Sequence, residues 1–185
     1  DAKDIKEASE NKQVVIVGTG FIGMEVASAL MEAGKVASIT IVGRSPRVMS
    51  NIVSESISDA LIDLHKEKGV NFAFGANVAE IVQDNGMVSG VVLDDGNKID
   101  ADMIILGTGV APRTEIIDEV NDPDGVQVND YLELRDGVYA LGDIAKATNQ
   151  MGRMRIEHWR VALQHGMVTA GAILNDDNVN TLEER

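Results

Sequence analysis

The fold is decided by the stretch Gln13–Gly34, which reads Q-V-V-I-V-G-T-G-F-I-G-M-E-V-A-S-A-L-M-E-A-G. Its four β-branched residues, Val14–Val17, predict a strand that is buried on both faces. Beyond the glycines, apolar residues recur at helical spacing and predict a helix that Gly34 ends: Ile22, Val26, Leu30 and Ala33. A strand therefore feeds directly into a helix.

Three glycines, Gly18, Gly20 and Gly23, stand between this strand and this helix in the order G-x-G-x-x-G. The order indicates a tight turn, a backbone bare enough to approach a pyrophosphate, and a helix start packed close to its strand. The amides and the dipole at the helix N-terminus favour an anion there. A purely structural turn is the other interpretation, but a second apolar strand, Ser38–Val42, completes the βαβ unit that dinucleotide binding requires.

Length and composition limit the classes of protein. The 185 residues suffice for one complete domain, and an apolar fraction of 44% is ordinary for a soluble globular protein. No apolar run is long enough to span a bilayer, and Asp1–Asn11 is too charged for a signal peptide. We expect a soluble intracellular protein, cytoplasmic or mitochondrial, whose sequence has lost its natural start and any targeting segment.

Charge and residue usage exclude further classes. A formal charge of −14, with 16 scattered Lys and Arg residues, opposes nucleic acid as a partner. Cysteine is absent, so a disulfide framework, a thiolate metal site and a redox-active cysteine pair are excluded within these residues. Electrons must then move on a cofactor. Three histidines show no metal-ligand grouping, and we expect no metal site: His65, His158 and His165.

The chain up to Gly109 continues as one helix and several strands. Apolar residues at helical spacing mark the helix, which Gly69 can end: Val53, Ile57, Ala60, Leu61 and Leu64. The strand Asn71–Phe74 follows it. Alternation and turn signals then predict a three-stranded meander: Val78–Val82, Met87–Leu93 and Lys98–Ile99. Met103–Leu106 is a further buried strand, and its return beside the first would bring Gly107-Thr108-Gly109 next to the same nucleotide.

The segment after Val110 is turn-rich and gives weaker signals. Gly137–Leu141 is a short apolar strand that Gly142-Asp143 stops. Met154–Leu174 is helical by spacing, with one apolar stripe: Ile156, Trp159, Leu163, Met167, Ala170 and Ile173. The polar tail from Asn175 is expected to fray.

Four stretches resemble, in this order, the flavin-dependent pyridine-nucleotide reductases, and among them the ferredoxin-reductase-like and apoptosis-inducing-factor-like proteins. They are V-V-I-V-G-T-G-F-I-G-M-E-V-A from Val14, I-I-L-G-T-G-V-A-P-R-T from Ile104, G-V-Y-A-L-G-D from Gly137, and Glu157-His158-Trp159. The resemblance implies an α/β fold, a Rossmann-like parallel sheet with a three-stranded β-meander, plus an incomplete second dinucleotide-binding (FAD) domain. Residues 1–110 would form the NAD(P)-binding domain and residues 111–185 the C-terminal segment of the FAD-binding domain.

The same resemblance implies an FAD-dependent NAD(P)H oxidoreductase, with NAD(P)H and FAD as cofactors. A hydride would pass from nicotinamide C4 to flavin N5, so the protein need only align two rings. The remainder of the FAD domain and an interface domain are absent from these residues. The sequence does not identify the redox acceptor, which could be a ferredoxin, a Rieske-type protein, a quinone or oxygen. The other class left open is a signalling protein that senses the redox nucleotide.

The resemblance also assigns residues to the cofactors. The nucleotide loops are Gly18, Thr19, Gly20, Phe21, Ile22 and Gly23, together with Gly107, Thr108 and Gly109. Glu25 would lie near the nicotinamide and flavin rings and position them; otherwise it is an exposed helix carboxylate that favours the dipole. Asp143 would hold the flavin's ribityl chain; otherwise it forms a turn.

The last helix would meet the flavin's pyrimidine edge at Glu157, His158 and Trp159. The helical stripe favours a core position for Trp159 over ring stacking.

The end of the second strand bears on which nucleotide binds. An acidic residue there accepts hydrogen bonds from the ribose of NAD, and Gly43 stands in its place. Arg44 and Arg47 add guanidinium groups that suit a phosphate, so we expect tolerance of NADP rather than strict NAD specificity. The glycine triplet could instead bind a flavin, with Asp143 completing that site, but such a site also wants the acidic residue that Gly43 replaces.

Overall fold

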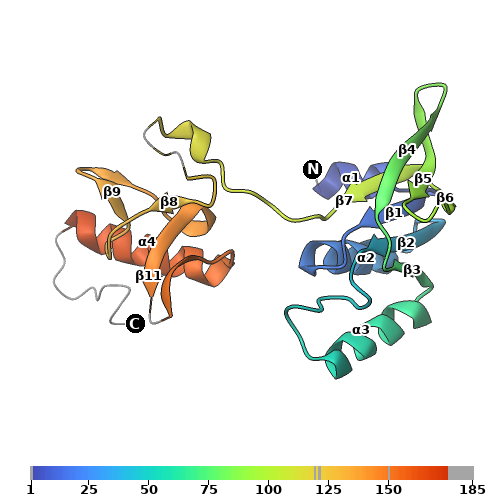
Figure 1. Cartoon of the computed structure of the whole chain (residues 1–185), viewed down its shortest axis with the longest axis horizontal. Helices are drawn as coiled ribbons and strands as arrows, with labels where there is room; N and C mark the ends of the chain where they lie inside the picture. Colours follow the sequence, from blue (N-terminus) through green and yellow to red (C-terminus); the bar gives the residue numbers. More distant parts are fainter. Residues whose placement is uncertain (1, 119, 121, 150, 175–185) are drawn as a thin grey trace. The chain divides into compact units, whose positions relative to one another are not determined.

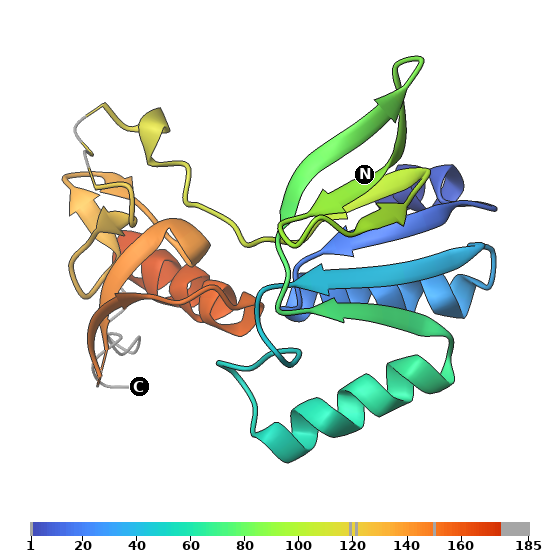
Figure 2. The same cartoon turned by 45° about the vertical axis from the view of Figure 1, so that its right-hand side comes forward.

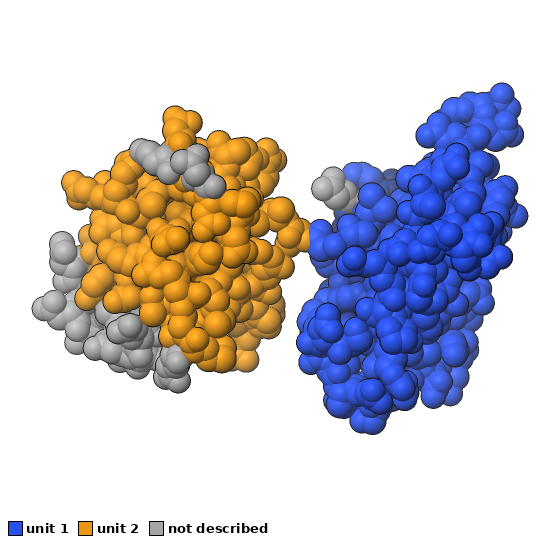
Figure 3. All heavy atoms as spheres, viewed as in Figure 1, with its two compact units in different colours: residues 1–109 blue, residues 110–185 orange. Residues whose placement is uncertain are grey.

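The structure is a computed structural model that describes residues 2–118, 120, 122–149 and 151–174. The chain forms two compact units, unit 1 from Asp1 to Gly109 and unit 2 from Val110 to Arg185 (Figures 1 and 3). Each unit has its own sheets and its own core. No helix in the described part of the chain is both long and apolar enough to cross a membrane.

Unit 1 is built on a four-stranded parallel sheet with the strand order β3-β2-β1-β7 (Figure 1). The predicted strands are all present and parallel, with Gln13 opposite Ser38 and Val14 opposite Met103. Their bounds are β1 Gln13–Val17, β2 Ser38–Gly43, β3 Val70–Phe74 and β7 Met103–Leu106. Because all four strands run the same way, their carboxyl ends share one edge, where the loops after β1, β2 and β7 meet.

Two helices cover one face of this sheet. They are α2 Phe21–Ala33 and α3 Glu55–Glu67, and a short helix, α1 Ala2–Ala8, precedes β1. Val14 and Ile16 of β1 pack against them in one core cluster, whose helical members are Met24, Ala27, Leu30 and Ile62. As predicted, Gly34 ends α2: it is the C-cap, in the left-handed conformation.

The predicted apolar stripes of both helices are partly wrong. Ile22 of α2 is 45% exposed, and Ile57 and Leu64 of α3 are 52% and 47% exposed. Polar side chains explain why α3 buries a different face from the predicted one, because the helix buries Ser58 and His65 instead. The Ser58 hydroxyl donates to the carbonyl of Val48 at 2.7 Å, and two atoms of His65 have polar partners, the Ser28 hydroxyl at 3.0 Å and the Leu61 carbonyl at 2.8 Å.

The predicted three-stranded meander is present, and the structure shows that it is antiparallel and covers the opposite face of the sheet. Its strands are β4 Val78–Asp84, β5 Met87–Leu93 and β6 Lys98–Asp100 (Figure 2). Val15 and Val42, the strand residues that point away from the helices, pack against Val91 and Leu93 of β5. Alternate residues of β1 therefore enter two different cores, which explains why all of Val14–Ile16 is buried.

Unit 2 holds more strands than the sequence predicts. One sheet has the order β12-β11-β8 and a second pairs β10 with β9. The bounds are β8 Val126–Gln127, β9 Glu133–Arg135, β10 Val138–Tyr139, β11 Ala145–Asn149 and β12 Gly152–Arg155, with short 3₁₀ turns η1 Thr114–Ile116 and η2 Gly142–Ile144. The expected helix start at Met154 is wrong, because Met154 pairs with Ala147 in a strand.

The last helix, α4 Trp159–Leu174, buries a different face from the predicted one. Trp159 is 69% exposed, and Leu163, Met167 and Ile173 are also exposed, so the expected core position of Trp159 is wrong. The buried side chains are His165, Val168 and Thr169, with Gly171. Small and polar residues therefore face the core of unit 2, and the large apolar ones face outward. The expected fraying from Asn175 onward lies outside the described residues.

Candidate dinucleotide-binding site

The glycines after β1 and β7 form one tightly packed cluster at the carboxyl edge of the sheet. A Cβ on Gly18, which has φ +121°, would lie 2.2 Å from the carbonyl oxygen of Gly107. A Cβ on Gly23 would lie 2.0 Å from the carbonyl oxygen of Gly18. Two of the three triplet glycines are therefore required by close backbone packing, and the two predicted loops do lie together.

Gly20 differs from its neighbours because the fold leaves space around it. A Cβ on Gly20 would meet no atom within 4 Å, and its φ of −84° is open to any residue. Gly20 is also the N-cap of α2, and no side chain caps this end of the helix. The amides of the first turn are thus available to an outside anion, which fits the approach of a pyrophosphate to bare backbone.

The loop after β7 completes the same edge. The Gly107 amide donates to the Val17 carbonyl at 2.8 Å, and this bond extends the β1–β7 pairing into the loop. Thr108 and Gly109 are exposed, and Gly109 has φ +106° with open space at its Cα.

Three side chains near the start of α2 are exposed beside these loops. Phe21 and Ile22 present large apolar surfaces, with 53% and 45% exposed, and Glu25 is also exposed. Among the described residues Glu25 has no hydrogen bond or ion pair, so its carboxylate is available to a ligand. Its expected role beside the cofactor rings stays a prediction.

The two predicted arginines after β2 have different surroundings. Arg44 is exposed, whereas Arg47 pairs with Asp59 and, at 3.6 Å, with Glu55 of α3. The hydrogen bond to Asp59 raises the pKa of Arg47 above its ordinary value. Arg47 therefore already binds two carboxylates, whereas Arg44 forms no ion pair among the described residues. Gly43 is buried, with the side chain of Thr19 directly against it.

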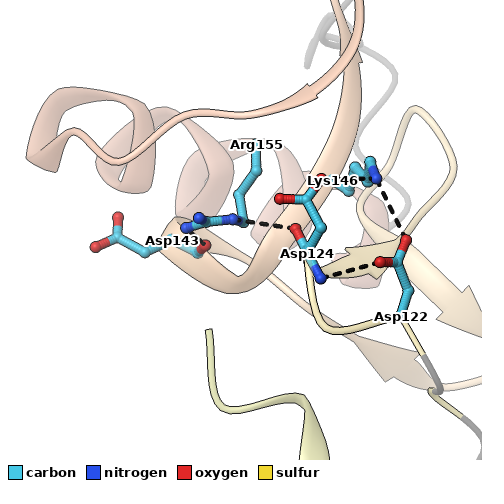
Figure 4. A network of polar contacts seen from close by, with 5 residues as sticks. All are labelled: Asp122, Asp124, Asp143, Lys146 and Arg155. Carbon is cyan, nitrogen blue, oxygen red and sulfur yellow. Dashed lines mark hydrogen bonds and ion pairs between the residues drawn. The ribbon is translucent and has the colours of Figure 1, made fainter. Parts of the chain in front are cut away.

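Asp143 and the start of α4 belong to unit 2. Asp143 lies in η2, and its carbonyl oxygen accepts a hydrogen bond from Arg155 Nη1 at 3.1 Å. Arg155 Nε also donates to the Asp124 carbonyl at 3.1 Å, so one guanidinium joins two loops (Figure 4). The Asp143 carboxylate points away from this network, as Figure 4 shows, and is exposed.

The loop before β8 is held by a lysine between two carboxylates. Lys146 Nζ lies 3.3 Å from Asp122 Oδ2 and 2.9 Å from Asp124 Oδ2 (Figure 4). The backbone amide of Asp124 and then Lys146 hold the pKa of Asp122 below its usual range, while the two carboxylates raise the pKa of Lys146. This ion cluster stabilises the loop that Arg155 ties to Asp143.

His165 holds the other side of η2. Its imidazole is 4% exposed, and Nδ1 accepts a hydrogen bond from the Gly142 amide at 3.1 Å. Acceptance at Nδ1 requires the neutral ring, and burial lowers the pKa of His165 in the same direction. The sequence gives no signal for this contact, because His165 and Gly142 are far apart in the chain. Arg155 was missed for the same reason.

Some residues at the start of α4 make contacts within unit 2. Glu157 pairs with Arg155. His158 starts the helix, since its Nδ1 accepts the Arg160 amide at 3.1 Å and its carbonyl accepts the Ala162 amide at 3.0 Å. Trp159 is exposed and stacks on His158, with ring centroids 6.0 Å apart. A flavin contact of these three residues stays a prediction.

Comparison with known proteins fits this geometry. The family model described as pyridine nucleotide-disulphide oxidoreductase matches residues 1–166. The chain belongs to this family. The prediction from the four sequence stretches is thereby confirmed at the level of the family.

Named reductases are among the relatives of the chain. The rubredoxin-NAD(+) reductase of Ectopseudomonas oleovorans is 35% identical over 94% of the chain and 46% of its own length. The ferredoxin–NAD(+) reductase component of the p-cumate 2,3-dioxygenase system of Pseudomonas putida is 33% identical over 84% of the chain and 38% of its own length. The chain thus spans less than half the length of these curated relatives.

A solved structure supports the observed fold of the chain. A ferredoxin reductase from Rhodopseudomonas palustris superposes with a TM-score of 0.84 at 27% identity, over 98% of the chain and 45% of the neighbour. The predicted α/β fold with a parallel sheet and a meander is confirmed by the structure and by this likeness.

Proposed function

We propose that this chain is the NAD(P)H-binding region, with part of the flavin-binding region, of an FAD-dependent NAD(P)H oxidoreductase. The observation that carries the proposal is the open space at Gly20. A packed glycine cluster explains Gly18, Gly23 and Gly107 by the fold alone, but no described residue of unit 1 requires a glycine at the uncapped start of α2. A dinucleotide does require a glycine there, because its pyrophosphate must come close to the protein backbone.

The residues of unit 1 supply distinct functions in this proposal. The amides that begin α2 bind the pyrophosphate, and Arg44 lies beside the adenosine ribose. The loop Gly107–Gly109 lies at the same edge of the sheet. Phe21 and Ile22 exclude water beside the nicotinamide, and Glu25 orients it. When bound, NAD(P)H and FAD supply the hydride and electron chemistry, so no residue of the chain need act as a nucleophile.

The acceptor is proposed only as a class. Two of the relatives are named for rubredoxin and ferredoxin, which favours a small electron-transfer protein over a quinone. Another relative is named NADH oxidase, so oxygen stays an alternative acceptor. The names of the first two also give NAD(+), whereas Gly43 and Arg44 of this chain favour NADP tolerance. Binding experiments on this chain should therefore compare NADH with NADPH.

Gly20→Ala tests the proposal directly. The added methyl group has space in the structure and an allowed φ, so the unfolding midpoint should stay the same or rise slightly. The methyl group would obstruct the pyrophosphate, and we expect the Kd for NADH and NADPH to rise by about tenfold or more, which is about 1.4 kcal/mol.

Gly166→Ala is the matched control. It adds the same methyl group at another open position, on α4 in unit 2, and should leave nucleotide binding unchanged. Equal nucleotide affinity in Gly20→Ala and the unaltered chain, measured by NADH fluorescence, would contradict the proposal.

A further inference from the structure

The carboxyl end of β2 contains a steric conflict that only glycine avoids. A Cβ on Gly43 would lie 2.4 Å from Thr19 Cγ2, 3.0 Å from Thr19 Oγ1 and 3.3 Å from Thr19 Cβ. Real Cβ atoms essentially never show contacts shorter than 3.0 Å. The φ of Gly43 lies outside the left-handed region, so the backbone itself would accept another residue. The side chain of Thr19 is therefore what excludes one.

The backbone around Thr19 is fixed, so Thr19 cannot easily move aside. Its carbonyl accepts the Met49 amide at 2.8 Å, which ties the loop after β1 to the loop after β2. On one side lies Gly18, packed against Gly107, and on the other Gly20 begins α2. Threonine is also β-branched and stiff at χ1. Relief of the clash would have to disturb this rotamer or the loop.

Position 43, where Thr19 excludes a side chain, is the position that contacts the ribose of a bound nucleotide in folds of this kind. In folds of this kind an acidic residue at the end of the second strand accepts hydrogen bonds from the 2′-hydroxyl of NAD and opposes a 2′-phosphate. In this chain the next residue, Arg44, is exposed and forms no ion pair among the described residues. A carboxylate is absent at this end of β2, and a cation is present.

We infer that Thr19 is a specificity-determining residue: its side chain keeps position 43 as glycine, excludes a carboxylate from the ribose end of the site, and so admits a 2′-phosphorylated dinucleotide. This inference rests on the proposed function, because it assumes that a dinucleotide lies across the glycine cluster. Its steric part concerns the free chain and is tested without any nucleotide.

A double-mutant cycle in the nucleotide-free chain tests the steric part. Gly43→Ala should destabilise unit 1 in the presence of Thr19 and much less in the background of Thr19→Ala, which removes the two nearest atoms. We expect the unfolding equilibrium constant of the double variant to differ by about tenfold or more from the value that the two single variants predict if their effects are independent. Thr40→Ala, on the same strand, is the matched control and should combine additively with Gly43→Ala. Additivity in both pairs would overturn the inference.

Nucleotide affinities test the specificity part. The Kd ratio of NADPH to NADH is measured for the unaltered chain and for Thr19→Ala/Gly43→Glu. The double variant should shift the ratio toward NADH by about tenfold or more, since a carboxylate now meets the ribose. An unchanged ratio overturns the inference. If the cycle shows coupling but the chain binds neither nucleotide, the proposed function fails, and the specificity role of Thr19 fails with it.

Discussion

Gly142 and Asp143 are held through their backbones, so that the Asp143 side chain stays exposed. His165 Nδ1 accepts the Gly142 amide, and Arg155 donates to the Asp143 carbonyl. His165→Leu keeps the apolar volume but leaves a partly buried amide without an acceptor, and should lower the free energy of unfolding of unit 2 by about 1–3 kcal/mol. His165→Gln offers a carbonyl oxygen and should recover a large part of the loss.

Thr169→Val is the control for His165→Leu. Thr169 is buried on the same face of α4, and its hydroxyl has no hydrogen-bond partner among the described residues, so replacement by valine should be neutral or stabilising. Urea unfolding and the hydrogen-exchange rate of the Gly142 amide report both effects. Equal exchange of Gly142 in the native chain and His165→Leu would show that the hydrogen bond is not formed.

The same histidine makes the stability of unit 2 dependent on pH. Burial lowers the folded-state pKa of His165 below its unfolded value of about 6.5. Below that value the unfolded chain binds the extra proton, so the stabilising contribution is complete above pH 6.5 and is lost as pH falls through the folded-state pKa. We expect the urea midpoint of the native chain to decrease more than that of His165→Gln as pH is lowered from 7.5 to about 5. Parallel midpoints over this range would refute the assignment.

The sequence predicted that the glycine loops pack closely together, but it gave no signal for the side-chain contacts that hold η2 and that exclude a Cβ at Gly43. Gly18, Gly20 and Gly23 were identified because only glycine permits close backbone approach, and spacing along the chain records that requirement. The contacts of His165 and Arg155 with η2 depend on tertiary folding, which leaves no periodic signal. The role of Thr19 against Gly43 was invisible for the same reason.

At the level of elements, hydrophobic periodicity predicted the helices but not the faces they bury. In α3 two polar residues, Ser58 and His65, enter the core because hydrogen bonds satisfy them, and Ile57 and Leu64 are left exposed. In α4 small residues face the sheet, and Leu163 and Met167 face outward. The strands of unit 2 were too short to show a period, since β8 and β10 have two residues each.

These elements predict unequal local stability. The parallel sheet of unit 1 is covered on both faces, whereas unit 2 has sheets of two and three strands and a helix with an exposed apolar face. Small sheets with few buried contacts open more easily. We expect the amides of β11 to exchange at least about tenfold faster than those of β1 in hydrogen-exchange mass spectrometry. Equal protection of the two strands in a monomeric sample would contradict this.

At the scale of the molecule, the chain carries one G-x-G-x-x-G run, and the sheet of unit 1 uses it. A flavin pyrophosphate needs a helix N-terminus of its own. We therefore expect the purified chain to carry no stoichiometric FAD. Absorbance near 450 nm after denaturation measures this, and one FAD per chain would show that the triplet, or another segment, binds flavin.

The most direct test of the central claim is the map of amide chemical-shift changes when NADPH or NADH is added to the isotope-labelled chain. Binding at the start of α2 predicts that the largest changes fall on Gly18–Gly23 and Gly107–Gly109, with those near Arg44 larger for NADPH. The Gly20→Ala chain should lose these changes at the same nucleotide concentration and keep its fold. Changes confined to other residues, or none at millimolar nucleotide, would contradict the assignment of unit 1 as the nicotinamide-nucleotide domain.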